Sequence, residues 1–165
     1  MNQNQEKTLA AWISVGSNTL LIIAKLVVGF LIQSVSVMSE AIHSGADLIA
    51  SVIALVAVRT SGKPADIDHP YGHGKSENIS GTLEAALIFF AAGWIIYEAI
   101  RKLVNMETMG DTSWGIGVMF VSVVANLLVS QYLFRVSKKT DSLALEADAW
   151  HLRTDVYTSA GVMAG

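Results

Sequence analysis

The chain has 165 residues, of which 52% are hydrophobic and only 15% charged, and its formal net charge is −3. A soluble domain usually carries about 25% charged residues, so this composition, with a mean hydropathy of +0.47, excludes an ordinary soluble domain and indicates a lipid environment. No cysteine is present, which excludes disulfides and thiolate metal sites, and we expect no nucleic-acid partner.

Five apolar segments are long enough to cross a bilayer as helices, because about 18 residues with few charges suffice. In chain order they cover residues 9–31, 37–58, 79–103, 114–136 and 143–165. The first is too long for a signal-peptide core and has no small-residue cleavage pattern, so we expect it to be retained. The sequence predicts an all-α, polytopic transmembrane helix bundle in which residues 1–165 form one transmembrane domain.

Lysine and arginine in the connecting segments predict the orientation, because they are enriched on the cytoplasmic side. With the N-terminus inside, the inner segments hold Lys7, Arg59, Lys63, Lys75, Arg135, Lys138 and Lys139. The outer side holds Arg101 and Lys102. We therefore expect a cytoplasmic N-terminus. Because the chain stops at Gly165 in an apolar stretch without a polar flank, we also expect a fragment that lacks at least one further helix.

A short repeat places ionisable residues inside two of the apolar segments. "EAIHSGAD" (40–47) and "DAWHLRTD" (148–155) share the pattern acid-Ala-x-His-x-x-x-Asp. In each copy the His and the Asp are four residues apart and therefore share one face of a helix. Ionisable groups at membrane depth are costly and normally face a partner, a cavity or a pathway.

The depths of the two pairs agree on antiparallel helices. With a rise of about 1.5 Å per residue, His43 and Asp47 lie roughly 9 and 15 Å below the outer face. In a core about 30 Å thick, His151 and Asp155 lie roughly 18 and 12 Å below it. The four side chains can therefore converge into a tetrahedral Zn²⁺ site. The competing interpretation is that they are packing groups, hydrogen-bonded across the bundle.

Several other charged residues lie near these pairs. Glu40 and Asp148, one turn before each His, fit either a role in orienting the ligands or a role as pathway carboxylates. Lys25 is a candidate for pairing with an acid on another helix, and Glu84 is one such acid. Arg153 lies off the face of the fifth segment's pair, and a structural ion pair is the expected role.

A second group of possible ligands lies between the second and third segments, in "DIDHPYGHGKSE" (66–77). Proline and glycine in this stretch discourage a continuous helix and allow the backbone to fold round an ion. The metal-capable residues are Asp66, His69 and His73. An ordinary solvated loop is the alternative.

Taken together, the two HxxxD patterns and "HPYGHGKSE" between them resemble the cation diffusion facilitators, over essentially the whole chain. The resemblance implies a homodimeric divalent-metal exporter with six transmembrane helices, of which five are present, and a cytoplasmic C-terminal domain, which is absent here. It places the transport site on His43, Asp47, His151 and Asp155. It places a second, cytoplasmic site on Asp66, His69 and His73. Two histidines with two aspartates resemble the zinc-preferring branch.

The expected function is efflux of Zn²⁺ in exchange for protons across a membrane, most simply the bacterial inner membrane. An unperturbed imidazole titrates near pH ~6.5 and must be neutral to bind a metal, so an acidic exterior would release the ion. Affinity order alone does not separate Zn²⁺ from other first-row cations, and Fe²⁺, Mn²⁺, Co²⁺ or Cd²⁺ remain alternatives. The sequence does not favour an enzyme, since no HExxH pattern is present. A non-transporting metal-binding or scaffold protein is the other class.

Overall fold

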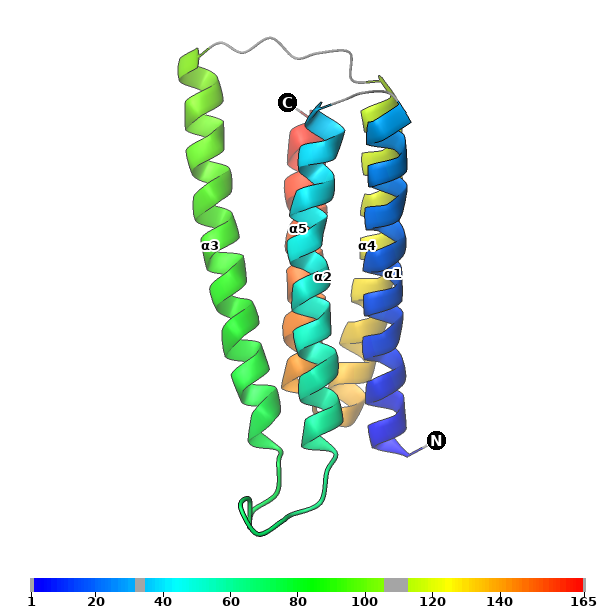
Figure 1. The fold of residues 1–165 in the computed structure, drawn as a ribbon, viewed down its shortest axis with the longest axis vertical. Helices are drawn as coiled ribbons and strands as arrows, with labels where there is room; N and C mark the ends of the chain where they lie inside the picture. Colours follow the sequence, from blue (N-terminus) through cyan, green and yellow to red (C-terminus); the bar gives the residue numbers. More distant parts are fainter. Residues whose placement is uncertain (1, 32–34, 106–112, 165) are drawn as a thin grey trace.

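The computed structural model describes residues 2–31, 35–105 and 113–164, and within these ranges the chain is helical, with no strand. The helices are α1 (Gln3–Leu31), α2 (Val35–Ser61), α3 (Lys75–Asn105), α4 (Ser113–Thr140) and α5 (Leu143–Ala164). They run lengthwise in one bundle, with α3 along one side and the 62–74 loop at the same end as the N-terminus (Figure 1). The predicted all-α fold is confirmed.

Local sequence explains why the helices are long and where they stop. Both prolines of the chain, Pro64 and Pro70, fall in the loop between α2 and α3, so no helix interior loses a backbone donor. The turn between α4 and α5 is tight. Asp141 adopts a positive φ of 54°, a conformation that Asp tolerates better than most residues, and the Ser142 hydroxyl accepts from the amide of Leu145 at 3.5 Å as an N-cap.

Three described helical stretches are apolar and long enough to cross a membrane, namely Gln3–Leu31, Ala41–Ser61 and Gly117–Thr140. Carboxylates also lie within α3 and α5, including Glu84, Asp148 and Asp155. Such groups are tolerated at membrane depth where they face the bundle interior. The chain is a membrane protein, and its buried ionisable residues lie on α1, α2, α3 and α5.

Small residues allow the helices to approach closely. The buried face of α1 carries Ala10, Ala11, Ser14 and Asn18 at helical spacing, and α2 contributes buried alanines to the same core. Without a hydrophobic driving force in lipid, close packing and hydrogen bonds hold helices together. Helix α2 lies between α1, α3 and α5, and α5 also packs on α4 and α3. The groups on α2 and α5 therefore meet at the centre of the bundle.

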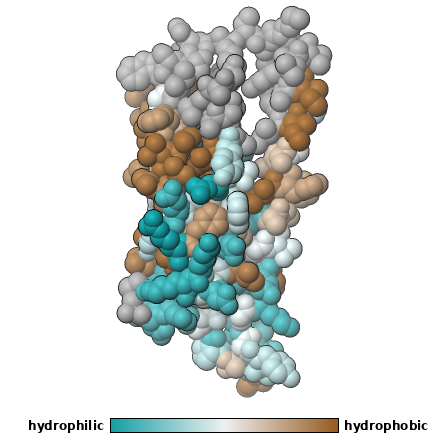
Figure 2. Space-filling model, turned by 180° about the vertical axis from the view of Figure 1, so that it is seen from behind, coloured by the Kyte–Doolittle hydropathy of each residue, from teal (hydrophilic) through white to brown (hydrophobic). Residues whose placement is uncertain are grey.

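The surface is divided along the bundle. On the face seen in Figure 2, hydrophilic residues gather toward the end that carries the 62–74 loop, and hydrophobic residues dominate the part above them. Large apolar side chains such as Leu20, Phe30, Phe89 and Phe90 are exposed. A helical bundle in a bilayer has an apolar surface where it contacts lipid and a polar surface where it meets water.

Candidate metal centre

The two HxxxD pairs face each other across the α2–α5 interface. His151 Nε2 on α5 lies 3.2 Å from Asp47 Oδ1 on α2 and 4.0 Å from Asp155 Oδ2 one turn along its own helix. His43, Asp47 and Asp155 offer ligand atoms that all lie within 4.8 Å of one another. We call His43, Asp47, His151 and Asp155 the four-residue site.

Two distances in this site can be compared with those around a tetrahedral ion, whereas His151 lies outside the close group that His43, Asp47 and Asp155 form. With bonds of about 2.0–2.1 Å, two ligand atoms on tetrahedral Zn²⁺ lie about 3.3 Å apart. The distance of 3.2 Å between His151 and Asp47 matches this value, and the 4.0 Å to Asp155 needs a small contraction. Asp47 and His151 are each 5% exposed. An ion held here would have little contact with bulk water.

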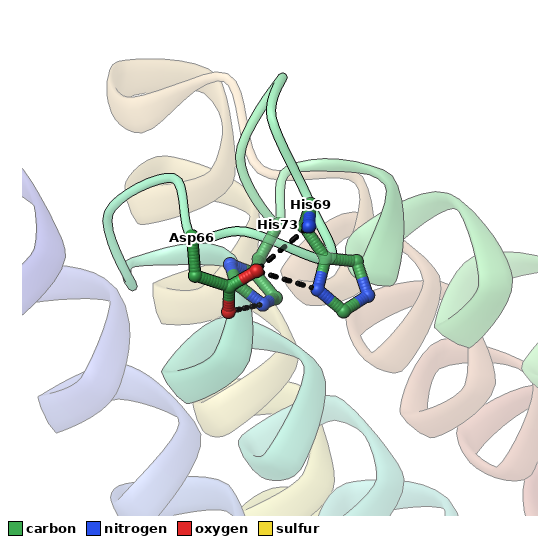
Figure 3. A group of neighbouring side chains, drawn as sticks. All are labelled: Asp66, His69 and His73. Carbon is green, nitrogen blue, oxygen red and sulfur yellow. Dashed lines mark hydrogen bonds and ion pairs between the residues drawn. The ribbon is translucent and has the colours of Figure 1, made fainter.

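The loop residues also come together, as a group that we call the loop triad (Figure 3). Asp66 Oδ1 accepts from the His69 amide at 2.7 Å and lies 3.0 Å from His69 Nδ1. Asp66 Oδ2 lies 3.3 Å from His73 Nε2, and the two imidazole rings are 4.3 Å apart. Ligand atoms of the three side chains thus lie within 4.8 Å of one another at the end of the bundle, with Asp66 and His69 exposed.

Electrostatics keep Asp66 ionised. The hydrogen bond from the His69 side chain, and after it the one from the His69 backbone, hold the pKa of Asp66 below its ordinary value of 3.8. A charged carboxylate is the form that binds a cation. The loop triad is therefore ready to accept a metal without first losing a proton from Asp66.

Two expectations about charged partners are wrong. Lys25 does not pair with Glu84. Its Nζ donates to Ser44 Oγ on α2 at 2.5 Å and its charge acts on Asp155, whereas Glu84 accepts from Ser80 on its own helix. Arg153 lies over the ring of Phe134, with 6.0 Å between the guanidinium carbon and the ring centroid, and stacks instead of forming the expected ion pair.

Asp148 lies one turn before His151, and among the described residues the two side chains form no hydrogen bond with each other. It is fully buried, and its Oδ1 accepts from Ser51 Oγ at 3.2 Å. The same hydroxyl lies 3.0 Å from Ser14 Oγ and accepts from Asn18 Nδ2 at 2.6 Å. Ser51 also contacts the backbone carbonyl of Asp47 at 3.1 Å. Sequence reasoning missed this network, although polar residues on the buried face of an apolar helix are its signal. The side chain of Glu40 lies outside the described residues.

A further missed residue is Glu77, at the start of α3. Its carboxylate accepts from Lys7 at 2.8 Å, Ser61 at 2.6 Å and Ser142 at 2.5 Å. Burial acts to raise the pKa of Glu77, but the hydrogen bonds from Lys7, Ser142 and Ser61 outweigh it and hold that pKa below 4.5. One carboxylate thus joins α1, α2 and α3 to the N-terminus of α5.

These features define a class of protein, a helical membrane bundle with a compact set of metal-capable side chains at its core and another at one end. Residues 11–165 match the cation efflux transmembrane domain family. Since this match covers nearly the whole chain, the protein belongs to the cation efflux family.

Several curated proteins are similar to this chain. The transporter MJ0449 of Methanocaldococcus jannaschii is 34% identical over 153 residues, 93% of this chain and 54% of its own length. The cation-efflux pump FieF of Shewanella oneidensis is 32% identical over 155 residues, 94% of this chain and 52% of the pump. The magnetosome protein MamB of Paramagnetospirillum magneticum is 30% identical over 154 residues, 93% and 52% of the two chains. The chain spans about half the length of these relatives.

Proposed function

We propose that the protein exports a divalent metal cation, with Zn²⁺ as its principal substrate, in exchange for protons. The observation that carries this proposal is the meeting of two His–Asp pairs across α2 and α5, with His151 Nε2 3.2 Å from Asp47 Oδ1. Buried ionisable groups in a membrane bundle mark an ion pathway more often than a packing contact. Family membership and the similarity to FieF, a cation-efflux pump, support the same class.

The ligand set supports zinc over hard cations. Two imidazoles and two carboxylates suit Zn²⁺, which takes four nitrogen or oxygen ligands. Mg²⁺ and Ca²⁺ prefer more oxygens. Fe²⁺, Mn²⁺, Co²⁺ and Cd²⁺ are alternative substrates, because affinity order alone does not separate them. With four protein ligands no position is left for an activated water, so transport fits the site better than catalysis.

The ligands also suit exchange for protons. A histidine ligand must be neutral and an aspartate ionised to hold the ion, so binding and protonation compete at the same atoms. Because Asp47 and His151 are buried and His43 and Asp155 are only partly exposed, an ion that leaves them exposes charges that protons can neutralise. In this proposal protons from outside displace the metal from the ligands, and a metal ion from inside then displaces the protons.

The proposed topology places the N-terminus and the 62–74 loop in the cytoplasm of a bacterial cell. The excess of Lys and Arg at this end supports the orientation. Asp66, His69 and His73 would then bind the metal on the side from which it is exported. We propose a homodimer as the working form, by analogy with the family.

Flux measurements in liposomes test the proposal. The protein is reconstituted with a zinc indicator and a pH indicator inside, and Zn²⁺ is added outside. We expect zinc entry with an opposite proton flux in the wild type, and neither flux in Asp47→Asn or His151→Ala. Glu146→Gln, an exposed carboxylate in the first turn of α5, is the matched control and should transport normally.

Each outcome separates the candidate functions. Unchanged zinc flux in both site variants would refute the site. Zinc binding without flux in the wild type would indicate a metal-binding scaffold, and flux of Mn²⁺ in preference to Zn²⁺ would move the substrate to another cation of the same class.

A further inference from the structure

Two carboxylates that the proposed transport site does not use lie fully buried between α3 and α5. Glu84 and Asp148 are each 0% exposed, and they lie close enough for their charges to act on each other. Helix α3 approaches α5 one turn before Glu84, where the Gly81 position lies near the backbone of Leu143 and the side chain of Ala147. The packing of α3 against α5 therefore brings Glu84 and Asp148 close to each other.

Each carboxylate keeps one oxygen without a hydrogen bond. Glu84 Oε1 accepts from Ser80 at 2.7 Å and Asp148 Oδ1 from Ser51 at 3.2 Å. Glu84 Oε2 and Asp148 Oδ2 are buried and have no hydrogen-bond partner in the part of the chain that the structure describes. No lysine or arginine of the described ranges forms an ion pair with either acid. A buried carboxylate oxygen without a partner is expensive, and a bound cation or a bound proton would lower that cost.

The pair lies between the polar end of the bundle and the four-residue site. Asp148 is one turn before His151 on α5, on the side of the 62–74 loop. On α3, Glu77, Ser80 and Glu84 follow each other at spacings of three and four, which places them on one face. Glu77 lines a pocket of about 220 Å³ that Lys7, Ser61 and Asn78 also line. A row of acids and hydroxyls thus runs from this pocket toward His151.

We propose that Glu84 and Asp148 bind a divalent cation at a second site inside the bundle, one turn closer to the loop end than the four-residue site. The ligands are carboxylate oxygens, with the hydroxyls of Ser51 and Ser80 next to them. An all-oxygen set binds hard or borderline cations and suits Mn²⁺ as a probe. The role of this site as a stage on the way to His151 rests on the proposed function, but its binding of a cation does not.

The charge supports a cation over a permanent ion pair. Two carboxylates near each other in a low-dielectric interior repel strongly. The positive charge that acts on Glu84 is that of His151, which itself contacts Asp47 and Asp155. A divalent ion between Glu84 Oε2 and Asp148 Oδ2 would satisfy both orphaned oxygens and cancel both charges.

Counting bound Mn²⁺ by electron paramagnetic resonance tests the proposal, with the protein in lipid nanodiscs and Asp66→Asn present in every sample to weaken the loop triad. We expect the protein that carries Asp66→Asn alone to bind one more Mn²⁺ per chain than the protein that also carries Glu84→Gln and Asp148→Asn. Glu84→Gln alone, which keeps the size of the side chain, should weaken that Mn²⁺ by about tenfold or more. Glu146→Gln is the control and should leave the count unchanged.

A second pair of variants separates this proposal from the transport site. Asp47→Asn with Asp155→Asn should lose tight Zn²⁺ binding by calorimetry and keep the additional Mn²⁺. If tight Zn²⁺ binding survives in that protein, the proposed transport site fails while the Mn²⁺ count still decides the second site. An unchanged Mn²⁺ count in Glu84→Gln and in the double variant would overturn the second site and leave the two acids as proton carriers or packing groups.

Discussion

His151 Nε2 lies 3.2 Å from Asp47 Oδ1, although 104 residues separate the two in the chain. The contact joins the second helix to the fifth at the centre of the bundle, and Asp155 lies 4.0 Å from the same nitrogen. A metal in this position would connect two helices that the sequence places far apart. The affinity of this site for a metal therefore depends on how α2 packs against α5.

Removing one ligand of the four-residue site should abolish tight zinc binding. Asp47→Asn keeps the shape of the side chain but loses the charge that the ion needs. We expect the Zn²⁺ dissociation constant to rise by about 100-fold or more, since even changes outside the ligand shell cost about 10–100-fold. Calorimetry in detergent measures this constant. Equal affinity in Asp47→Asn and in the wild type would show that the ion binds elsewhere.

The loop triad should bind metal independently of the four-residue site. Asp66→Asn removes the carboxylate that contacts both His69 and His73, so we expect the weaker of two Zn²⁺ binding phases to disappear while the tighter phase remains. Because the pKa of Asp66 is held below 3.8, protonation of this residue should not limit binding at any pH above that value. Exposed Asp68→Asn is the matched control.

Lys25 should weaken metal binding by charge repulsion. Its ammonium group donates to Ser44 and acts on Asp155, so it stabilises the metal-free carboxylates. Lys25→Met should tighten Zn²⁺ binding by about five- to tenfold, the size of a partly screened charge interaction inside a protein. Ser44→Ala removes the same hydrogen bond and keeps the charge, and it should leave the affinity near the wild-type value. If the two variants behave alike, the hydrogen bond and not the charge is responsible.

Glu77 should make the stability of the loop end depend on pH. Its pKa in the folded protein lies below the ordinary 4.5, so folding favours the ionised form. The stabilisation is complete above pH 4.5 and is lost as the pH falls through the folded value. Glu77→Gln should lower the free energy of unfolding by about 1–3 kcal/mol at neutral pH and by less in acid.

Denaturant titration in bicelles at both pH values measures the effect of Glu77→Gln. Glu6→Gln removes an exposed ion pair with Lys139 at the same end and serves as the control, with little effect at either pH. An equal loss for Glu77→Gln at neutral and acid pH would contradict the role of its charge.

Hydropathy and one repeated motif were enough to predict the helices and the residues that meet at the centre. The helices extend past the predicted segments, from Gln3 and to Thr140 for example, because hydropathy marks the part of a helix suited to lipid and not where its hydrogen bonds end. His and Asp four apart in an apolar stretch carry a strong signal, since few other reasons place them there.

The partners of the remaining polar residues could not be predicted. Lys25 contacts Ser44 and not Glu84, and Glu77 gathers Lys7, Ser61 and Ser142 from three other parts of the chain. These contacts depend on how each helix is rotated about its axis. That rotation is set by close packing of small residues, which hydropathy does not resolve.

Ser51 has one hydrogen and three possible acceptors for it, of which one is Ser14 Oγ at 3.0 Å. Its hydroxyl lies 3.1 Å from the Asp47 carbonyl and 3.2 Å from Asp148 Oδ1, while Asn18 supplies a hydrogen bond to its oxygen. A hydroxyl donates once, so the hydrogen points to the backbone of α2, to the Asp148 side chain on α5 or to the Ser14 hydroxyl on α1. An ionised Asp148 is the stronger acceptor of this hydrogen, because a charged carboxylate forms stronger hydrogen bonds than a neutral carbonyl. The Ser51 hydroxyl therefore lies between the α2 backbone at Asp47 and the Asp148 carboxylate on α5.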